Sequence, residues 1–236
     1  MGQFSTGRNT LIKKVDINTM YLRDFVVSSY RGYPEKNEFD FSVGCVESLY
    51  FASLPKKVPT TEFAKIIIEP VELSQGKFSH QKMLDVIEVR SGFDFGAYWN
   101  ASEKDRKLQI LKLIQNSVAY LAETFGWDIR PFDEAYHRVI EKDFVHQFFL
   151  KKYKVVSPNK KLKAQIFVDF QVDEIKMHLV VTDKTGKELL RKLFVSVPPR
   201  NFFIMDAAGS LAWDGDEKVV IASRNKKGNW TIELAL

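Results

Sequence analysis

Hydrophobic residues recur with two different spacings, in successive segments of this chain of 236 residues. Before residue 96, apolar positions occur every second residue or in short β-branched runs, as they do in strands with one buried face. The clearest alternation is formed by Phe39, Phe41, Val43 and Cys45. The runs at 66–68 and 86–89 are rich in isoleucine and valine, which favour strands. This stretch is therefore predicted to be mostly β-structure.

Between residues 100 and 126 the period lengthens to that of a helix with one buried face. The residues on that face are Leu108, Leu111, Val118, Ala122 and Phe125, widened by Ile110, Ile114 and Leu121. Asn100 and Glu103 have the types and spacing of a capping box, and Gly126 suits the helix end. A second helix is predicted over 131–142, which opens with a proline followed by acidic residues.

Strand periodicity returns after residue 146, with turn signals rich in Asp, Asn and Gly at 183–186, 214–215 and 225–228. Turns this short join antiparallel neighbours, because a parallel crossover needs about a dozen residues or more. The predicted fold class is α+β: antiparallel sheets flank a central two-helix segment, and a β-meander forms the C-terminal part.

The whole chain, 1–236, is predicted to be a single α+β domain, because no flexible linker or low-complexity tract interrupts it. If there are two domains, the best boundary is the polar stretch 157–161, which follows neither period. It would separate a mixed β/helical part at 1–156 from a β-meander part at 157–236.

Composition narrows the class of protein. With 45% hydrophobic residues, nineteen phenylalanines and four tryptophans, the chain can bury a substantial core and is not disordered. No apolar run is long enough to span a bilayer, and the first ten residues contain no apolar stretch of signal-peptide length. Cys45 is the only cysteine, so neither an internal disulfide nor a cysteine-based zinc site can form. We therefore expect a cytoplasmic protein.

Positive charge is concentrated in the C-terminal part. Residues 146–236 contain sixteen lysines and arginines against ten acidic residues, whereas residues 1–145 contain nineteen against twenty. This excess favours an acidic partner, either a protein with an acidic face or a nucleic acid. The densest basic segment, which also holds an aromatic ring, consists of Lys151, Lys152, Tyr153, Lys154, Lys160, Lys161 and Lys163. These are candidate phosphate-binding and stacking groups; alternatively, they are the solvated faces of two strands beside a turn.

Leu113 and Tyr120 are two further candidate binding residues. They lie seven positions apart on the predicted helix 100–126, on the side opposite its main apolar face. Either the helix is covered on both sides, or these two side chains contribute to a partner surface. Coverage on both sides is the simpler interpretation, because it requires only an ordinary core.

Motifs for catalysis and cofactor binding are scarce. No glycine-rich loop precedes a helix, which argues against nucleotide-binding folds. Glu134, His137 and Glu141 have the spacing of ligands in a di-metal helix bundle, but such a site needs the pattern twice. No serine lies in a nucleophile-elbow sequence. We therefore predict no metal and no cofactor, and an enzyme only if its site is assembled from dispersed residues.

The segment 93–142 resembles uncharacterised bacterial proteins of the toxin-immunity type, which bind a cognate toxin and block it. The resemblance rests on Phe93-Asp-Phe95, Tyr98-Trp99, the helical run 107–114, Gly126-Trp-Asp128 and the run 132–140. These residues are of the kind that pack helices together, so the resemblance implies no particular site residue. Immunity proteins of nucleases are commonly acidic, whereas this chain has a net charge of +5. A toxin with an acidic face is therefore the more fitting target.

Together these features predict a non-enzymatic protein-binding module, of the immunity or inhibitor type, that occludes a toxin or an enzyme. Aromatic and basic side chains would anchor such a partner. The alternatives are a nucleic-acid-associated protein that uses the Lys-rich hairpin and an enzyme with a dispersed site.

Overall fold

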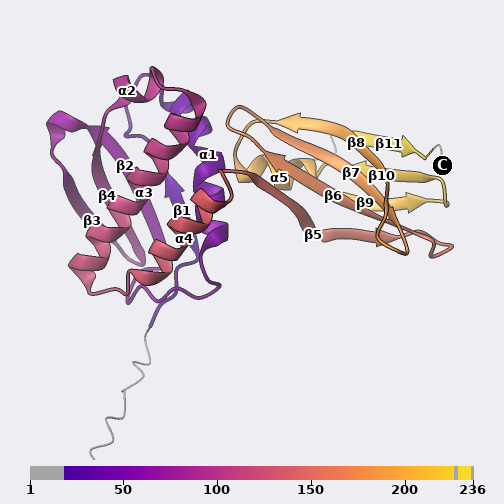
Figure 1. Ribbon diagram of the computed structural model, residues 1–236, viewed down its shortest axis with the longest axis horizontal. Helices are drawn as coiled ribbons and strands as arrows, with labels where there is room; N and C mark the ends of the chain where they lie inside the picture. Colours follow the sequence, from indigo (N-terminus) through magenta and orange to yellow (C-terminus); the bar gives the residue numbers. More distant parts are fainter. Residues whose placement is uncertain (1–18, 226–227, 235–236) are drawn as a thin grey trace, which may run out of the picture.

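The computed structural model describes residues 19–225 and 228–234, which form two lobes along the long axis of the molecule (Figure 1). The N-lobe, residues 19–145, combines a sheet with the long helices, and the C-lobe, residues 146–234, is mostly β-structure. Each lobe has its own cluster of buried hydrophobic side chains. The arrangement confirms the α+β class.

The N-lobe sheet has the strand order β1-β2-β4-β3. Its strands are β1 (Asp24–Val27), β2 (Lys65–Glu72), β3 (Phe78–Met83) and β4 (Val86–Phe93). β1, β2 and β4 run parallel, and β3 is antiparallel to β4. This sheet departs from the antiparallel pairing expected from the sequence, because a helix crosses over between β1 and β2 and lets them pair in parallel.

The crossover helix, α1 (Lys36–Ser53), lies where the alternation at 39–45 predicts a strand, so that prediction is wrong. The helix is buried on several sides. Phe39, Val43 and Leu49 belong to the N-lobe core, whereas Cys45 belongs to the core of the C-lobe. A helix enclosed by two cores needs no broad polar face, so its sequence lacks the usual 3.6-residue alternation of apolar and polar stripes.

The two predicted helices are present as α3 (Glu103–Phe125) and α4 (Arg130–Glu141), preceded by the short helix α2 (Phe95–Trp99). The N-cap of α3 is Ser102, not Asn100. The Ser102 hydroxyl accepts a hydrogen bond from the backbone N–H of Asp105, and Asn100 instead ends α2. Gly126 ends α3 in the left-handed conformation, as expected.

The C-lobe is a sandwich of two antiparallel sheets (Figure 1). The predicted β-meander of the C-terminal part is divided between these two sheets. One sheet is formed by β5 (His146–Val156), β6 (Leu162–Phe170), β7 (Ile175–Asp183) and β8 (Glu188–Val197). The short helix α5 (Asn201–Ala207) leads to the other sheet, which is formed by β9 (Ser210–Asp214), β10 (Lys218–Ala222) and β11 (Asn229–Glu233). The stretch 157–161 is the turn between β5 and β6, so it lies inside the C-lobe and does not separate the two cores.

Helix α1 packs closely against the C-lobe. The Sγ atom of Cys45 donates a hydrogen bond to the carbonyl of Phe170 at 3.0 Å. Gly44 permits the close approach, because a Cβ atom at this position would lie only 2.1 Å from the carbonyl oxygen of Pro199. The only cysteine and one glycine of the helix therefore mark the contact between the lobes.

A buried ion pair reinforces this contact. Oε2 of Glu47, on α1, accepts a hydrogen bond from Nη1 of Arg200 at 2.8 Å and another from the backbone N–H of Val27 at 2.8 Å. Arg200 also donates to the carbonyl of Val27 at 3.1 Å. Burial raises the pKa of Glu47, and the charge of Arg200 opposes that rise. One arginine of the C-lobe thus donates hydrogen bonds to both a helix and a strand of the N-lobe.

Candidate functional site

The six lysines of the candidate basic segment lie together on β5, β6 and the turn between them. Lys163 is half-buried and the others are exposed. Lys151 and Lys152 lie where the pairing of β5 with β6 shifts its register, between Phe149 and Lys154. The turn itself lies at the end of the C-lobe that points away from the N-lobe (Figure 1).

Tyr153 belongs to the buried core of the C-lobe, and only 6% of it is exposed. Its ring therefore lies beneath the lysines and is not available for stacking at the surface. The ammonium group of Lys152 lies 5.4 Å from the centre of this ring. The aromatic member of the basic segment thus has a core position.

Acidic side chains of the other sheet lie beside the lysine turn. Oδ1 of Asp216, in the β9–β10 turn, accepts a hydrogen bond from the backbone N–H of Asn159 at 2.9 Å. Glu217 lies in the same turn, and Asp214 is the last residue of β9. Their negative charges oppose the attraction that Lys160 and Lys161 would exert on a phosphate.

Leu113 and Tyr120 lie in the N-lobe, far along the chain from the lysines. Leu113 is buried. The ring of Tyr120 stacks on Phe78 of β3 at 5.0 Å, and its hydroxyl is 2.9 Å from Nδ1 of His80. Both side chains thus pack against neighbouring parts of the N-lobe, and the structure does not bring them together with the lysines.

A row of four large side chains crosses the outer face of the β5–β8 sheet. The strand register puts them side by side in the order Phe149, Phe167, His178 and Leu193. We call these four residues the outer row. Their neighbours along the strands, such as Ile166 and Met177, are buried in the core, since successive side chains point to opposite faces. Phe149 is 41% exposed and Leu193 is 47% exposed.

The guanidinium group of Arg191 lies over the ring of Phe167, 4.3 Å from its centre. Its Nε and Nη2 atoms donate to the two carboxylate oxygens of Glu188 at 2.9 and 2.7 Å. Burial and the nearby positive charge of Arg191 lower the pKa of His178. The centre of the outer face therefore combines apolar and aromatic groups with a neutralised arginine.

The outer row was missed by sequence reasoning because its members lie on four different strands. Phe149 and Phe167 carry a signal in hindsight: both occupy positions between the core-facing residues of their strands, where polar side chains are usual. Only the register between strands reveals that these exceptions are adjacent. The rings of Phe149 and Phe167 lie 5.2 Å apart.

Ser48 and His146 are the nearest approach to a nucleophile and a base. Oγ of Ser48 lies 2.9 Å from Nε2 of His146 and 3.2 Å from Oδ1 of Asn201. Burial lowers the pKa of His146 to about 4, with a smaller effect from Lys142, so the imidazole is a weak base at neutral pH. Ser48 also lies within helix α1 rather than on an exposed turn. The geometry fits a contact between the lobes.

Two of the candidate metal ligands of α4 contact neighbours within the same helix. Glu134 is held by an ion pair with Arg138 at 2.8 Å, and His137 packs edge-on against Tyr136. Within residues 19–225 and 228–234, no group of three or more potential ligands is placed to hold a metal ion. Over the same residues, no helix has both the length and the apolar character needed to cross a membrane.

Known proteins do not indicate a function for this chain, so the proposed function depends on the geometry described above. No protein-family model, no curated protein and no solved structure matches this chain. The resemblance to toxin-immunity proteins thus stays a prediction.

Proposed function

We propose that this protein is a non-enzymatic protein-binding module that contacts its partner through the outer row and the basic residues around it. The observation that supports this proposal is the alignment of Phe149, Phe167, His178 and Leu193 on one solvent-facing sheet surface. An apolar centre rich in aromatic groups, with charged residues at the rim, is the usual anatomy of a protein interface.

Charge favours a partner with an acidic rim. Residues 146–200 contain twelve basic and five acidic side chains. Of the basic ones, Lys176, Arg191 and Arg200 form ion pairs with acidic residues. The exposed lysines of β5, including Lys152 and Lys154, have no such ion pair within the described chain. They would therefore steer an acidic surface toward the apolar centre.

The mechanism would be occlusion, as in an immunity or inhibitor protein. Phe149 and Leu193 would insert between apolar groups of a toxin or enzyme, and the surrounding sheet would cover its active site. Binding of this kind requires no catalytic group in the module itself.

A nucleic acid fits the same face less well. Arg191 is neutralised by Glu188 and already covers one side of the Phe167 ring. Tyr153 is in the core. Phe149 is then the remaining ring of the outer row with a large exposed fraction, whereas single-strand binding proteins stack several successive bases.

Photo-crosslinking in cells tests the proposal. A benzophenone amino acid replaces Phe149, and in a matched control it replaces Phe202, a phenylalanine of α5 that is 58% exposed. We expect one protein adduct from position 149 that is absent from position 202 and is lost with Leu193→Asp. The purified partner should then bind Phe149→Asp about 30-fold more weakly or worse, and Phe202→Asp with unchanged affinity.

Several outcomes would refute this assignment. A nuclease-sensitive adduct would indicate a nucleic acid, and an adduct with a second copy would indicate a homodimer. Equal adducts from both positions would place the interface elsewhere. In the nucleic-acid case, submicromolar oligonucleotide binding would weaken steeply with salt, and replacing Lys160, Lys161 and Lys163 by alanine would flatten the salt slope by about one unit per lost phosphate contact.

A further inference from the structure

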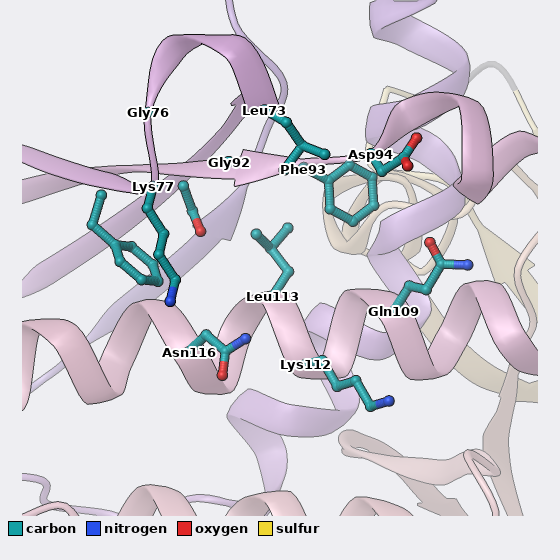
Figure 2. A pocket seen from close by; sticks show the side chains of 12 residues that line it. Leu73, Gly76, Lys77, Gly92, Phe93, Asp94, Gln109, Lys112, Leu113 and Asn116 are labelled. Atoms are coloured by element: carbon teal, nitrogen blue, oxygen red, sulfur yellow. The ribbon is translucent and has the colours of Figure 1, made fainter.

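A pocket of about 390 Å³ lies in the N-lobe, between the C-terminal half of β4 and helix α3. The 3₁₀ turn η1 (Leu73–Gln75) and the residues after it form its outer wall. Figure 2 shows Leu113 pointing from α3 into the space below β4. The pocket is in a different lobe from the outer row, so it requires an explanation of its own.

Small residues in β4 create the space. Ile87, Val89 and Phe93 fill the helix-facing side of this strand, but Ser91 occupies the same side with a much smaller side chain. The following residue, Gly92, lets the chain of the outer wall lie close, because a Cβ atom there would be 2.8 Å from the carbonyl oxygen of Gly76. The strand therefore leaves a hollow above Leu113, which lines the pocket although it is only 4% exposed.

The α3 side of the pocket is formed by one helical face. Gln109, Lys112, Leu113 and Asn116 follow the spacing i, i+3, i+4 and i+7, which places them on the same side of the helix. Figure 2 shows the side chain of Lys77 extending from the opposite wall toward Asn116, whereas Lys112 points away from Leu113. Lys77 is thus the cation best placed at the pocket, and Lys112 adds positive charge nearby.

Four polar side chains of this pocket have no partner within the described residues, whereas Asp94, which also lines it, accepts a hydrogen bond from the backbone N–H of Ala97. Ser91 is only 3% exposed, yet its hydroxyl forms no hydrogen bond within the described residues. The side chains of Lys77, Gln109 and Asn116 are likewise without a hydrogen bond or ion pair there. The Ser91 hydroxyl is open to the pocket, and Lys77 and Asn116 are exposed to solvent around it. A few polar groups that converge on an apolar hollow are the usual composition of a small-molecule site.

We propose that this pocket binds a small carboxylate with an apolar body. Lys77 would pair with the carboxylate, Ser91 and Asn116 would donate hydrogen bonds to it, and Leu113 and Phe93 would contact the apolar part. A cavity of about 150 Å³ accommodates benzene, so the larger space here suits a body of about two rings.

Calorimetric titration of the full chain tests this proposal with naphthalene-2-carboxylate. The uncharged naphthalene-2-carboxamide has nearly the same shape and serves as the matched ligand. We expect the carboxylate to bind about tenfold more tightly or better, since a charge-assisted bond to Lys77 is lost with the amide. Lys77→Gln should remove this preference, whereas Lys56→Gln, at an exposed lysine outside the pocket, should preserve it.

Ser91→Val provides a second test, because it removes the hydroxyl and narrows the pocket by one carbon atom without introducing a charge. Both ligands should lose affinity by about tenfold or more, while the thermal unfolding curve confirms that the variant is folded. Equal affinity for the two ligands, equal effects of Lys77→Gln and Lys56→Gln, or unchanged binding by a folded Ser91→Val protein would each overturn the proposal. Failure to detect heat at millimolar ligand would also overturn it, with no bearing on the outer row.

Discussion

Arg200→Ala removes the arginine that joins the two lobes, and its effect on stability depends on pH in a defined way. Arg200 is the charged partner of Glu47, and their side chains are 14% and 9% exposed. Because burial raises the pKa of Glu47, the folded protein holds this proton more tightly than the unfolded chain does. Stability is then lost as pH rises through the folded pKa. Without Arg200 that pKa rises further, which extends the loss to neutral pH.

Two limits set the magnitude. If Glu47 stays ionised, removing one partner of a buried pair costs about 3–5 kcal/mol. If Glu47 instead takes up a proton, the cost is at most roughly 3.7 kcal/mol at pH 7, from an unfolded pKa of about 4.3, and at most about 1 kcal/mol at pH 5, because wild-type Glu47 already bears part of it through its raised pKa. The hydrogen bond from Arg200 to the carbonyl of Val27 adds about 1 kcal/mol at either pH. We therefore expect a loss of no more than about 5 kcal/mol at pH 7 and no more than about 2 kcal/mol at pH 5.

Urea unfolding at pH 5 and pH 7 measures both values, with tryptophan fluorescence and circular dichroism compared to check for a single transition. Lys104→Ala is the matched control, since Lys104 pairs with Asp143 at 2.9 Å on the exposed surface. It should lower the free energy of unfolding by no more than about 1 kcal/mol at either pH. A loss below about 1 kcal/mol for Arg200→Ala at pH 7 would refute the reasoning, as would an equal loss at both pH values.

Leu111 is fully buried in α3. Replacing it by alanine should lower the free energy of unfolding by about 2–5 kcal/mol, and an unchanged denaturation midpoint would contradict this. Gly44→Ala should lower the thermal midpoint because its Cβ would meet Pro199 at 2.1 Å, whereas Gly96→Ala, with 3.5 Å to its nearest neighbour, should not. Since the folded pKa of His146 is lowered to about 4, stability should fall as pH drops from about 6.5 toward 4. His146→Gln should reduce that fall in acid-denaturation curves. Elemental analysis should find no stoichiometric metal, and about one zinc or iron per chain would overturn that expectation.

The elements that sequence reasoning identified are those with one buried and one solvated face. Helix α3 has that pattern, and Gly126 marks its end. The β-meander follows from alternating residues and from turn residues such as Gly186 and Gly215, both of which have positive φ. In these segments the chain's own periodicity and turn chemistry agree with the tertiary environment, so local information is sufficient.

Helix α1 shows where local information fails. Each of the polar and small residues that suggested a strand makes its own contact with another part of the fold. Asp40 accepts hydrogen bonds from Ser28 and Ser29, Ser42 bonds to Tyr98, and Gly44 admits the chain at Pro199. These contacts are made with other parts of the chain. They explain why polar and apolar residues alternate in this segment although it is a helix and not a pleated strand.

The sequence by itself determined the α+β composition, the long helix, the meander and the basic C-terminal part, because each depends on neighbouring residues or on a simple count. The tertiary structure alone decided which exposed side chains lie together. Strand register aligns Phe149 with Leu193 across four strands, and the packing of β4 on α3 leaves Ser91 facing Leu113. Both candidate sites depend on distances between residues far apart along the chain, and a sequence fixes such distances only through the complete fold.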